Sequence, residues 1–278
     1  MRQGAPPSAL LVTDLDGTLL NAAHQIGAAD RAALHALGER GVCRVAATGR
    51  SLYSLRRVLT PADPFDFVVF SSGVGILDWP TQTLIRATEL TAMQTTAAVR
   101  SLVAGGANFM VHAPVPENHC FVYHESLEQA TDFRRRCTLY QAYCRAMTDD
   151  DDFAQGASQF VVVMEPDLLR FQRLADGMTG LSVVRTTSPL DGVSLWMEVF
   201  PPGTNKSGAA AFLAGRLGVP HGQTYALGND FNDADLLAWA AHACVTANAP
   251  SELRRRYREV RSHDAAGFAD AASAWELC

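Results

Sequence analysis

Short apolar runs alternate with helical patterns along the first 73 residues, and this alternation constrains the fold more strongly than any other feature of the sequence. Each run has the length of a buried strand and ends in a polar turn. The runs are residues 10–13, 42–47 and 67–70. Between them, residues 30–40 carry apolar side chains at helical spacing, and residues 52–59 predict a second helix. Strands and helices in this order predict a parallel sheet with right-handed crossovers.

The pattern changes after about residue 80 and returns at Asn205. The intervening segment has shorter predicted strands and more turn residues, and residues 127–147 are predicted to be mostly helical. Such a segment is typical of an inserted second domain. We therefore expect an α/β protein with a doubly wound, Rossmann-like core of residues 1–82 and 188–278, and an α+β domain inserted over residues 83–187.

Composition excludes several classes of protein. Hydrophobic residues make up 48% of the 278 residues, which excludes a disordered chain or a disulfide-stapled miniprotein. The formal net charge of −6 argues against a nucleic-acid partner. No apolar run reaches the roughly 18 residues of a membrane span, and the first residues lack a signal-peptide pattern. The six cysteines form no C-x-x-C pair, so we expect free thiols and a cytoplasmic protein without a membrane partner.

Polar residues follow four of the predicted strands. They are Asp14 and Asp16, Thr48, Ser72 and Gly73, and finally Asn229, Asn232 and Asp233. Lys206, the only lysine in the chain, opens a predicted helix. Ligands bind beyond the carboxyl ends of strands in open parallel sheets. A single aspartate in such a place is usually a turn or cap residue, but this many coincidences favour a common site.

Carboxylates, a hydroxyl and an ammonium together suit phosphoryl transfer. A carboxylate that attacks phosphorus forms an aspartyl-phosphate, which divides one slow step into two. Positioning and charge neutralisation at the phosphoryl oxygens must supply most of the acceleration. A second acid two residues after the nucleophile, the relation between Asp14 and Asp16, can protonate the leaving oxygen and later deprotonate water. Gly17 allows a sharp turn whose backbone N–H groups can bind phosphate.

Four segments resemble the motifs of the haloacid dehalogenase (HAD) superfamily of phosphohydrolases. They are DLDGTLLN at residues 14–21, ATGR at 47–50, EVFPPGTNKSGA at 198–209 and LGNDFNDADLL at 227–237. Their order and spacing are similar to the Cof-like and sucrose-phosphatase-like branch, in which a large α/β cap is inserted between the second and third motifs. The resemblance covers about residues 9–80 and 190–275. It implies that the inserted domain is a cap that closes over the catalytic edge.

The resemblance also implies individual roles. Asp14 would be the nucleophile and Asp16 the general acid and base, while Thr48 and Lys206 would bind the transferring phosphoryl group. The other implied substrate contacts are Leu15, Gly17, Gly49, Arg50, Ser72, Gly73 and Asn232. The expected substrate is a small phosphorylated metabolite, and the cap type implies a sugar phosphate. A monomer and a homodimer are both compatible with the sequence.

Magnesium is the cofactor that the resemblance implies. Its ligands would come from Asp14, the Asp16 backbone carbonyl, Asn229 and Asp233, although Asp233 could instead orient Lys206. Asn229 departs from the family, which usually has an aspartate there. An amide oxygen still binds hard cations but contributes one negative charge less. We therefore expect weaker magnesium affinity, with loss of catalysis as the alternative.

Other functions fit the same residues less well. A phosphosugar mutase on the same scaffold would transfer the phosphoryl group between hydroxyls. A response-regulator receiver also places Asp, Thr and Lys around magnesium, but receivers are short and lack an inserted domain. A non-catalytic phosphosugar-binding protein is the third alternative. His119, Cys120 and His124 are expected to have structural roles, because residues 120 and 124 on one strand would lie about 13 Å apart.

Overall fold

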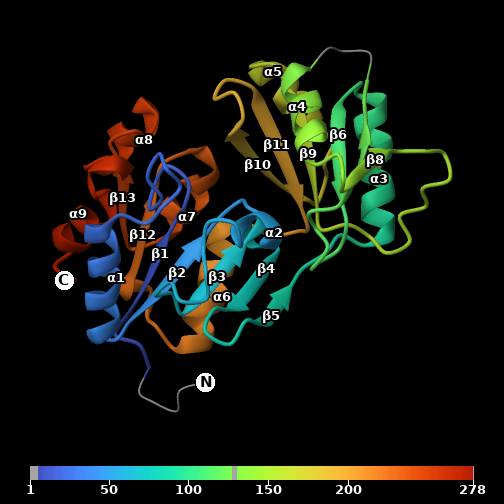
Figure 1. The fold of residues 1–278 in the computed structure, drawn as a ribbon. Helices are drawn as coiled ribbons and strands as arrows, with labels where there is room; N and C mark the ends of the chain where they lie inside the picture. The colour runs from blue at the N-terminus through green and yellow to red at the C-terminus, as the bar shows by residue number, and fades with distance from the viewer. Residues whose placement is uncertain (1–5, 127–129, 278) are drawn as a thin grey trace. The chain divides into compact units, whose positions relative to one another are not determined.

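The computed structural model describes residues 6–126 and 130–277, and the chain divides into two compact units. The core unit comprises residues 1–86 and 205–278, and the cap unit comprises residues 87–204. Figure 1 shows that each unit contains its own sheet. The mixed α/β class predicted from the sequence is confirmed. Among the described helices, none combines the length and hydropathy needed to cross a membrane.

The core sheet contains eight strands within the described residues, in the order β14-β13-β12-β1-β2-β3-β4-β5. Their bounds are β1 Ala9–Thr13, β2 Val42–Ala47, β3 Phe67–Phe70, β4 Gly75–Asp78, β5 Thr83–Ala87, β12 Thr224–Gly228, β13 His242–Thr246 and β14 Arg258–Val260. Strand β1 is central and pairs in parallel with β2 and β12. All five of its residues are buried, as expected for a parallel strand covered on both faces.

Helices cover both faces of the core sheet. Helices α6 (Lys206–Leu217) and α7 (Ala234–Trp239) pack on the face that carries Leu10, Val12 and Val45. Helix α1 (Ala28–Glu39) packs beside α9 (Gly267–Ala274) on the other face, where the Arg44 side chain donates to the Leu34 carbonyl at 3.2 Å. Arg44 and Val45 point to opposite faces because side chains alternate along a strand. The doubly wound core is therefore confirmed.

Two core segments differ from the sequence prediction. Helix α2 spans only Leu52–Leu55, whereas the sequence predicts a helix over 52–59. After α2 the chain continues in turns, which place Leu59 in the core. Strands β4 and β5 were not predicted. Strand β4 pairs antiparallel with β3, and Gly75 allows this close return because a Cβ there would lie 1.9 Å from the Phe70 ring.

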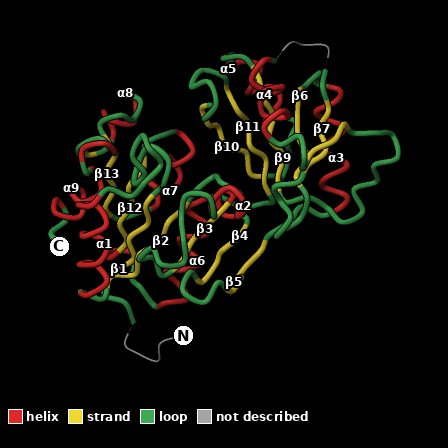
Figure 2. The backbone as a smooth tube through the Cα atoms, in the orientation of Figure 1, coloured by secondary structure: helices red, strands yellow, loops and turns green. Residues whose placement is uncertain are grey.

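The cap sheet contains six strands in the part of the chain that the structure describes, in the order β10-β11-β9-β6-β7-β8. Their bounds are β6 Asn108–His112, β7 Phe121–His124, β8 Cys144–Ala146, β9 Gln159–Met164, β10 Ser182–Thr187 and β11 Leu195–Phe200. Helices α3 (Ala92–Ala104) and α5 (Leu168–Asp176) pack on one face through Leu102 and Leu174. Helix α4 (Thr131–Leu139) packs on the opposite face through Phe133. Figure 2 shows these helices beside the strands of the cap.

The second boundary of the insertion lies later than the sequence prediction. The prediction places it between residues 187 and 188, whereas the structure places it between 204 and 205. The reason is strand β11, which pairs antiparallel with both β10 and β9 and thus belongs to the cap sheet. Sequence patterns predict a strand over 194–199 but do not show which sheet accepts it.

The sequence predicts that residues 127–147 are mostly helical. The structure differs from this prediction. Residues 127–129 lie outside the described residues, and α4 covers only Thr131–Leu139. Residues 144–146 form strand β8, which pairs in parallel with β7 at the sheet edge. Backbone hydrogen bonds to β7 therefore override the local helical pattern. In the core, helix α8 spans Ser251–Arg256 and precedes α9.

Candidate active site

The site lies at one edge of the core sheet, where several strands end. Asp14 follows β1, Thr48 follows β2 and Ser71 follows β3. Asn229 follows β12, and Lys206 is the first residue of α6. Strands β12, β1, β2 and β3 are parallel neighbours, so their carboxyl ends meet at the same edge. The sequence prediction that these segments converge is consistent with this arrangement.

Lys206 joins two acidic residues from distant segments. Its Nζ lies 2.7 Å from Oδ1 of Asp14 and 2.6 Å from Oδ1 of Asp233. Lys206 is 1% exposed, Asp14 is 4% exposed and Asp233 is fully buried. Buried charges of this kind persist only where they are paired and hydrogen-bonded. The three side chains therefore form one unit, which we call the buried triad.

Burial and charge together set the protonation of the buried triad. Burial is the largest influence on Asp14 and raises its pKa to about 7, although the ammonium of Lys206 acts to lower it. Burial also disfavours the charged form of Lys206, but Asp14 and Asp233 outweigh burial and raise the pKa of Lys206 above its ordinary value. The lysine therefore stays protonated at neutral pH. Two carboxylates face one ammonium, so an additional cation is electrostatically favoured beside Asp14.

Asp233 holds the lysine and the loop after β12. Its Oδ1 accepts a hydrogen bond from Lys206, and its Oδ2 accepts from the backbone N–H groups of Asn229 at 2.8 Å and Asp230 at 3.2 Å. Both oxygens are thus directed at donors. Of the two roles that the sequence left open for Asp233, this geometry favours orienting Lys206. Gly228 is required beside it, because a Cβ there would lie 2.6 Å from the Asp233 carboxylate.

Asp16 forms a bidentate ion pair with Arg50. Both Nε and Nη2 of Arg50 lie 2.6 Å from the carboxylate oxygens of Asp16. The Asp16 side chain is 40% exposed, so it remains reachable from solvent. Arg50 was expected to contact substrate, but in this structure it contacts the expected general acid. The pair fixes the direction of the Asp16 carboxylate, because a guanidinium binds a carboxylate in one plane.

The turn after β3 packs against the start of α6. Ser72 has a φ of 52° and Gly73 a φ of 110°. A Cβ on Gly73 would lie 2.4 Å from the backbone oxygen of Asn205, so only glycine fits there. The backbone N–H of Ser72 donates to the carbonyl of Thr48 at 2.9 Å, which ties this turn to the end of β2. Positive φ at three consecutive buried residues, Ser71, Ser72 and Gly73, is typical of a functional turn.

The remaining expected substrate contacts differ in their accessibility. Leu15 is fully buried, and its carbonyl accepts from the N–H groups of residues 18, 19 and 20, so only its backbone can serve the site. Gly49 is half-buried at the end of β2. Asn232 is half-buried, and its Oδ1 is buried without a hydrogen-bond partner in the protein. A buried acceptor of this kind is satisfied by a ligand or water, which supports the expected role of Asn232.

Asn229 could supply an oxygen ligand to a magnesium ion. Asn229 packs against the loop after β1, since a Cβ on Gly17 would lie 2.4 Å from its Nδ2. The Asn229 Oδ1 accepts a hydrogen bond from the Thr18 hydroxyl at 3.1 Å. Magnesium prefers carboxylate, carbonyl and amide oxygens. The groups that could hold such an ion are the Asp14 carboxylate, the Asp16 backbone carbonyl and the Asn229 side chain.

Some residues of the site were missed by sequence reasoning. Asn205 caps α6, and its Oδ1 accepts from the Gly208 N–H at 2.7 Å. Asp235 accepts from the Ser207 N–H at 2.8 Å. Both residues fix the helix that begins with Lys206. An asparagine directly before a predicted helix is a recognisable cap, so Asn205 could have been found, whereas the Asp235 contact depends on the fold.

Comparisons with known proteins identify the family of this chain. The sequence profile of the haloacid dehalogenase-like hydrolases matches residues 11–271. The HMP-PP phosphatase of Cronobacter sakazakii is 28% identical over 246 residues, covering 86% of this chain and 84% of the relative. The HMP-PP phosphatase of an Enterobacter species is 27% identical over 252 residues, covering 88% and 86%.

Solved structures show the same fold over the whole chain. BT1666 of Bacteroides thetaiotaomicron, described among the phosphatases of the HAD enzyme superfamily, superimposes with a TM-score of 0.80 at 18% identity, covering 100% of this chain and 98% of that one. BT4131, described as a HAD subclass IIB sugar phosphatase, superimposes with a TM-score of 0.75 at 15% identity, covering 97% and 100%. At these identities the likeness concerns the fold.

Proposed function

Because this chain belongs to the haloacid dehalogenase-like hydrolase family, we propose that it is a magnesium-dependent phosphomonoester hydrolase that acts through an aspartyl-phosphate. The observation that carries the proposal is the 2.7 Å contact between Lys206 Nζ and Asp14 Oδ1 in a buried setting. A carboxylate fixed beside a permanent ammonium can approach a phosphate dianion, since the ammonium offsets the repulsion between the two anions.

In the first step, the Asp14 carboxylate attacks phosphorus and the bond between phosphorus and the ester oxygen breaks. The Asp16 carboxyl gives its proton to the leaving oxygen, which departs as an alcohol. Lys206 and the Thr48 hydroxyl face the phosphoryl oxygens, where negative charge must be stabilised. The ion pair with Arg50 requires Asp16 to be a carboxylate, so Asp16 leaves Arg50 and takes up a proton as substrate enters before it acts as the acid.

In the second step, the Asp16 carboxylate takes a proton from water, and the resulting hydroxide attacks the phosphorus of the aspartyl-phosphate. The bond between phosphorus and the Asp14 oxygen breaks, which releases inorganic phosphate and restores the carboxylate. Asp16 is suited to this second role because its side chain is 40% exposed, whereas Asp14 is almost fully buried. Water therefore reaches the base more readily than the nucleophile.

Magnesium would be held by Asp14, the Asp16 carbonyl and Asn229. When bound, it supplies a second positive charge for the substrate phosphate. Lys206 and Asp233 remain paired beside it, so the lysine keeps its position through the cycle. Asn229 provides a neutral ligand, from which we infer a weaker magnesium affinity than an aspartate would give.

The substrate class is a small phosphorylated metabolite. The neighbour described as a sugar phosphatase supports a sugar phosphate, and the relatives named HMP-PP phosphatases support HMP-PP as the second compound to test. A panel of sugar phosphates and HMP-PP is assayed for release of inorganic phosphate with added magnesium. The compounds that are hydrolysed identify the substrate class. We expect one group of related compounds to exceed p-nitrophenyl phosphate in kcat/KM.

The same assay separates the alternatives. Sustained phosphate release by the wild type, abolished in Asp14→Asn, supports hydrolysis. A phosphomutase would convert one sugar phosphate into another with little free phosphate, and a receiver would turn over once and stop. Absence of any phosphate release across the panel, with folded protein and saturating magnesium, would contradict the proposal.

A further inference from the structure

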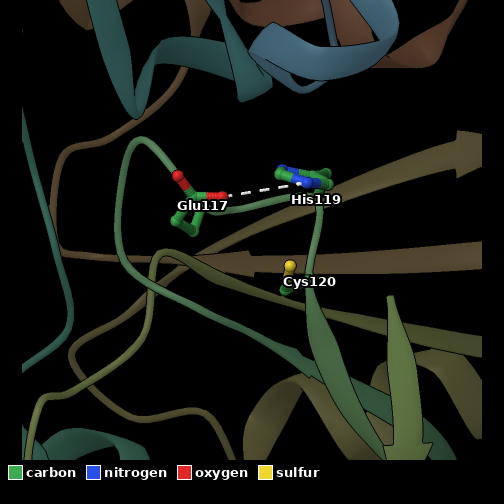
Figure 3. A group of neighbouring side chains, drawn as sticks. All are labelled: Glu117, His119 and Cys120. Carbon is green, nitrogen blue, oxygen red and sulfur yellow. Dashed lines mark ion pairs between the residues drawn. The ribbon is translucent and has the colours of Figure 1, made fainter. Parts of the chain in front are cut away.

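Three side chains of metal-ligating type gather in the cap loop between β6 and β7. Glu117, His119 and Cys120 offer a carboxylate oxygen, an imidazole nitrogen and a sulfur that all lie within 4.8 Å of one another. The His119 Nε2 lies 3.8 Å from the Glu117 Oε2. Figure 3 shows the three side chains on one loop segment, with the ion pair between Glu117 and His119 dashed. The buried triad contributes none of these residues, so the group requires its own explanation.

Backbone hydrogen bonds hold this turn in place. The Cys120 N–H donates to the Glu117 carbonyl at 2.8 Å and closes the turn. The Ala113 N–H donates to the Cys120 carbonyl at 2.9 Å and closes the loop onto β6. His112, which is 2% exposed, lies with its Nδ1 2.8 Å from the Asn118 carbonyl. A carbonyl only accepts, so Nδ1 is the donor and fixes the backbone between the three side chains.

The surroundings leave room for a further ligand. The His119 ring packs edge-on against Tyr143 with centroids 4.8 Å apart, and its side chain is 12% exposed. Cys120 and Tyr143 also line a cavity of about 800 Å³ in the cap. Glu117 is exposed, so the turn is reachable from solvent. A rigid imidazole and a half-buried thiol beside a cavity are the arrangement of an open metal site.

We propose that Glu117, His119 and Cys120 bind a transition-metal ion of the zinc class, with a fourth position open to water or a small ligand from the cavity. Thiolate and imidazole favour zinc over magnesium, which prefers oxygen ligands only. The 3.8 Å separation of nitrogen and oxygen is close to that of two ligands on one tetrahedral zinc, about 3.4 Å for bonds of about 2.1 Å. As the metal–sulfur bond forms, the Cys120 thiol releases its proton to solvent.

The ligand set differs from the one that the sequence suggested and set aside. His124 lies at the far end of β7, where its ring stacks on Phe109 with centroids 5.2 Å apart. It lies outside the group of Glu117, His119 and Cys120. Glu117 supplies the third ligand instead, and the structural role expected for His119 and Cys120 is extended to metal binding under this proposal.

Cobalt titration of the whole protein tests the site. The protein is stripped with a chelator, returned to excess magnesium to fill hard-cation sites, and titrated with Co²⁺. We expect one equivalent to produce a thiolate-to-cobalt charge-transfer band in the near ultraviolet, which zinc then removes by competition. Cys120→Ser should abolish the band. Glu117→Gln should retain the band but weaken cobalt affinity by about tenfold or more, the loss seen when a supporting group of a metal site is removed.

Cys137→Ser is the matched control, because Cys137 lies in the same unit on α4 but outside the cluster. It should leave the titration unchanged. A wild type without the band, or a band that survives Cys120→Ser, would overturn the proposal. Since Glu117 is exposed, Glu117→Gln is expected to fold, so the test does not depend on the Cys120 variant alone. The readout is spectroscopic and independent of phosphatase activity.

Discussion

At the residue scale, the ammonium of Lys206 lies between two buried carboxylates that come from residues 14 and 233. An arginine keeps the charge but has a larger planar head that cannot occupy the same space. Lys206→Arg should therefore lower kcat by about 10²–10³, the usual loss when one group that stabilises the transition state is removed. Steady-state kinetics measure this, with circular dichroism to confirm folding. A variant with the wild-type rate would mean that the lysine position is incidental to catalysis.

Asn229 offers a test of the metal ligands. Asn229→Asp replaces the side-chain amide nitrogen with an oxygen and adds the negative charge that the wild-type site lacks. The half-saturating magnesium concentration for phosphate release should fall by roughly tenfold, because ligand charge governs affinity for hard cations. A magnesium titration of both proteins gives the result. An unchanged half-saturation value would show that Asn229 is not a ligand.

His112 makes the stability of the cap depend on pH. Burial, aided by the nearby Arg136 charge, lowers its pKa to about 3 from an ordinary value of 6.5. The unfolded chain therefore binds a proton that the folded chain does not, between about pH 6.5 and 3. Its contribution to stability is complete above pH 6.5 and is lost progressively as the pH falls through this window. The free energy of unfolding should thus fall by about 2 kcal/mol from this group between pH 7 and 5.

Urea unfolding at several pH values checks this expectation. His112→Gln removes the titrating group, so its unfolding free energy should depend less on pH over the same range. His35→Gln is the control, because His35 is exposed on α1. A His112 variant that keeps the full wild-type pH dependence would place the origin of that dependence elsewhere.

At the element scale, the turn after β3 supports the first residue of α6. Gly73→Ala would place a Cβ 2.4 Å from the Asn205 oxygen at a φ of 110°. We expect a loss of about 2 kcal/mol or more in the free energy of unfolding, since both strain and a backbone collision are introduced. Catalysis should fall as well, because Asn205 caps the helix that begins with Lys206.

Gly222→Ala is the matched control for this variant. A Cβ at Gly222 would meet nothing within 4 Å, and its backbone is not left-handed. Thermal unfolding of the two variants should show a clear decrease for Gly73→Ala and little change for Gly222→Ala. Equal effects of the two substitutions would remove the argument that this turn positions α6.

Comparing the strands and helices with their predictions shows which of them sequence patterns alone can predict. Strands β2 and β3 have the predicted bounds, because continuous apolar runs between turns mark buried strands well. Strand β8 and the pair β4 and β5 were missed, since they are short and gain their stability from neighbouring strands. Helix α2 was overestimated because propensity does not show where the chain must turn back to the core.

At the scale of the whole molecule, the convergence of distant segments could be predicted because parallel strands share one edge. The pairing of Lys206 with Asp14 follows from that rule and from the single lysine in the chain. The Arg50–Asp16 pair could not be predicted, since it depends on the conformations of two loops with half-exposed side chains. The second domain boundary was placed too early for a similar reason: sheet membership of β11 is decided by tertiary pairing.

The most direct test of the account is rapid chemical quench with phosphate-labelled substrate. During turnover, the wild type should carry a transient phosphoryl group that maps to the peptide containing Asp14, and Asp14→Asn should carry none. Asp16→Asn, given a substrate whose leaving group needs no proton, should accumulate the label because water is no longer activated. Turnover by the wild type without any labelled protein, or a label on another residue, would contradict the assignment of Asp14 as nucleophile.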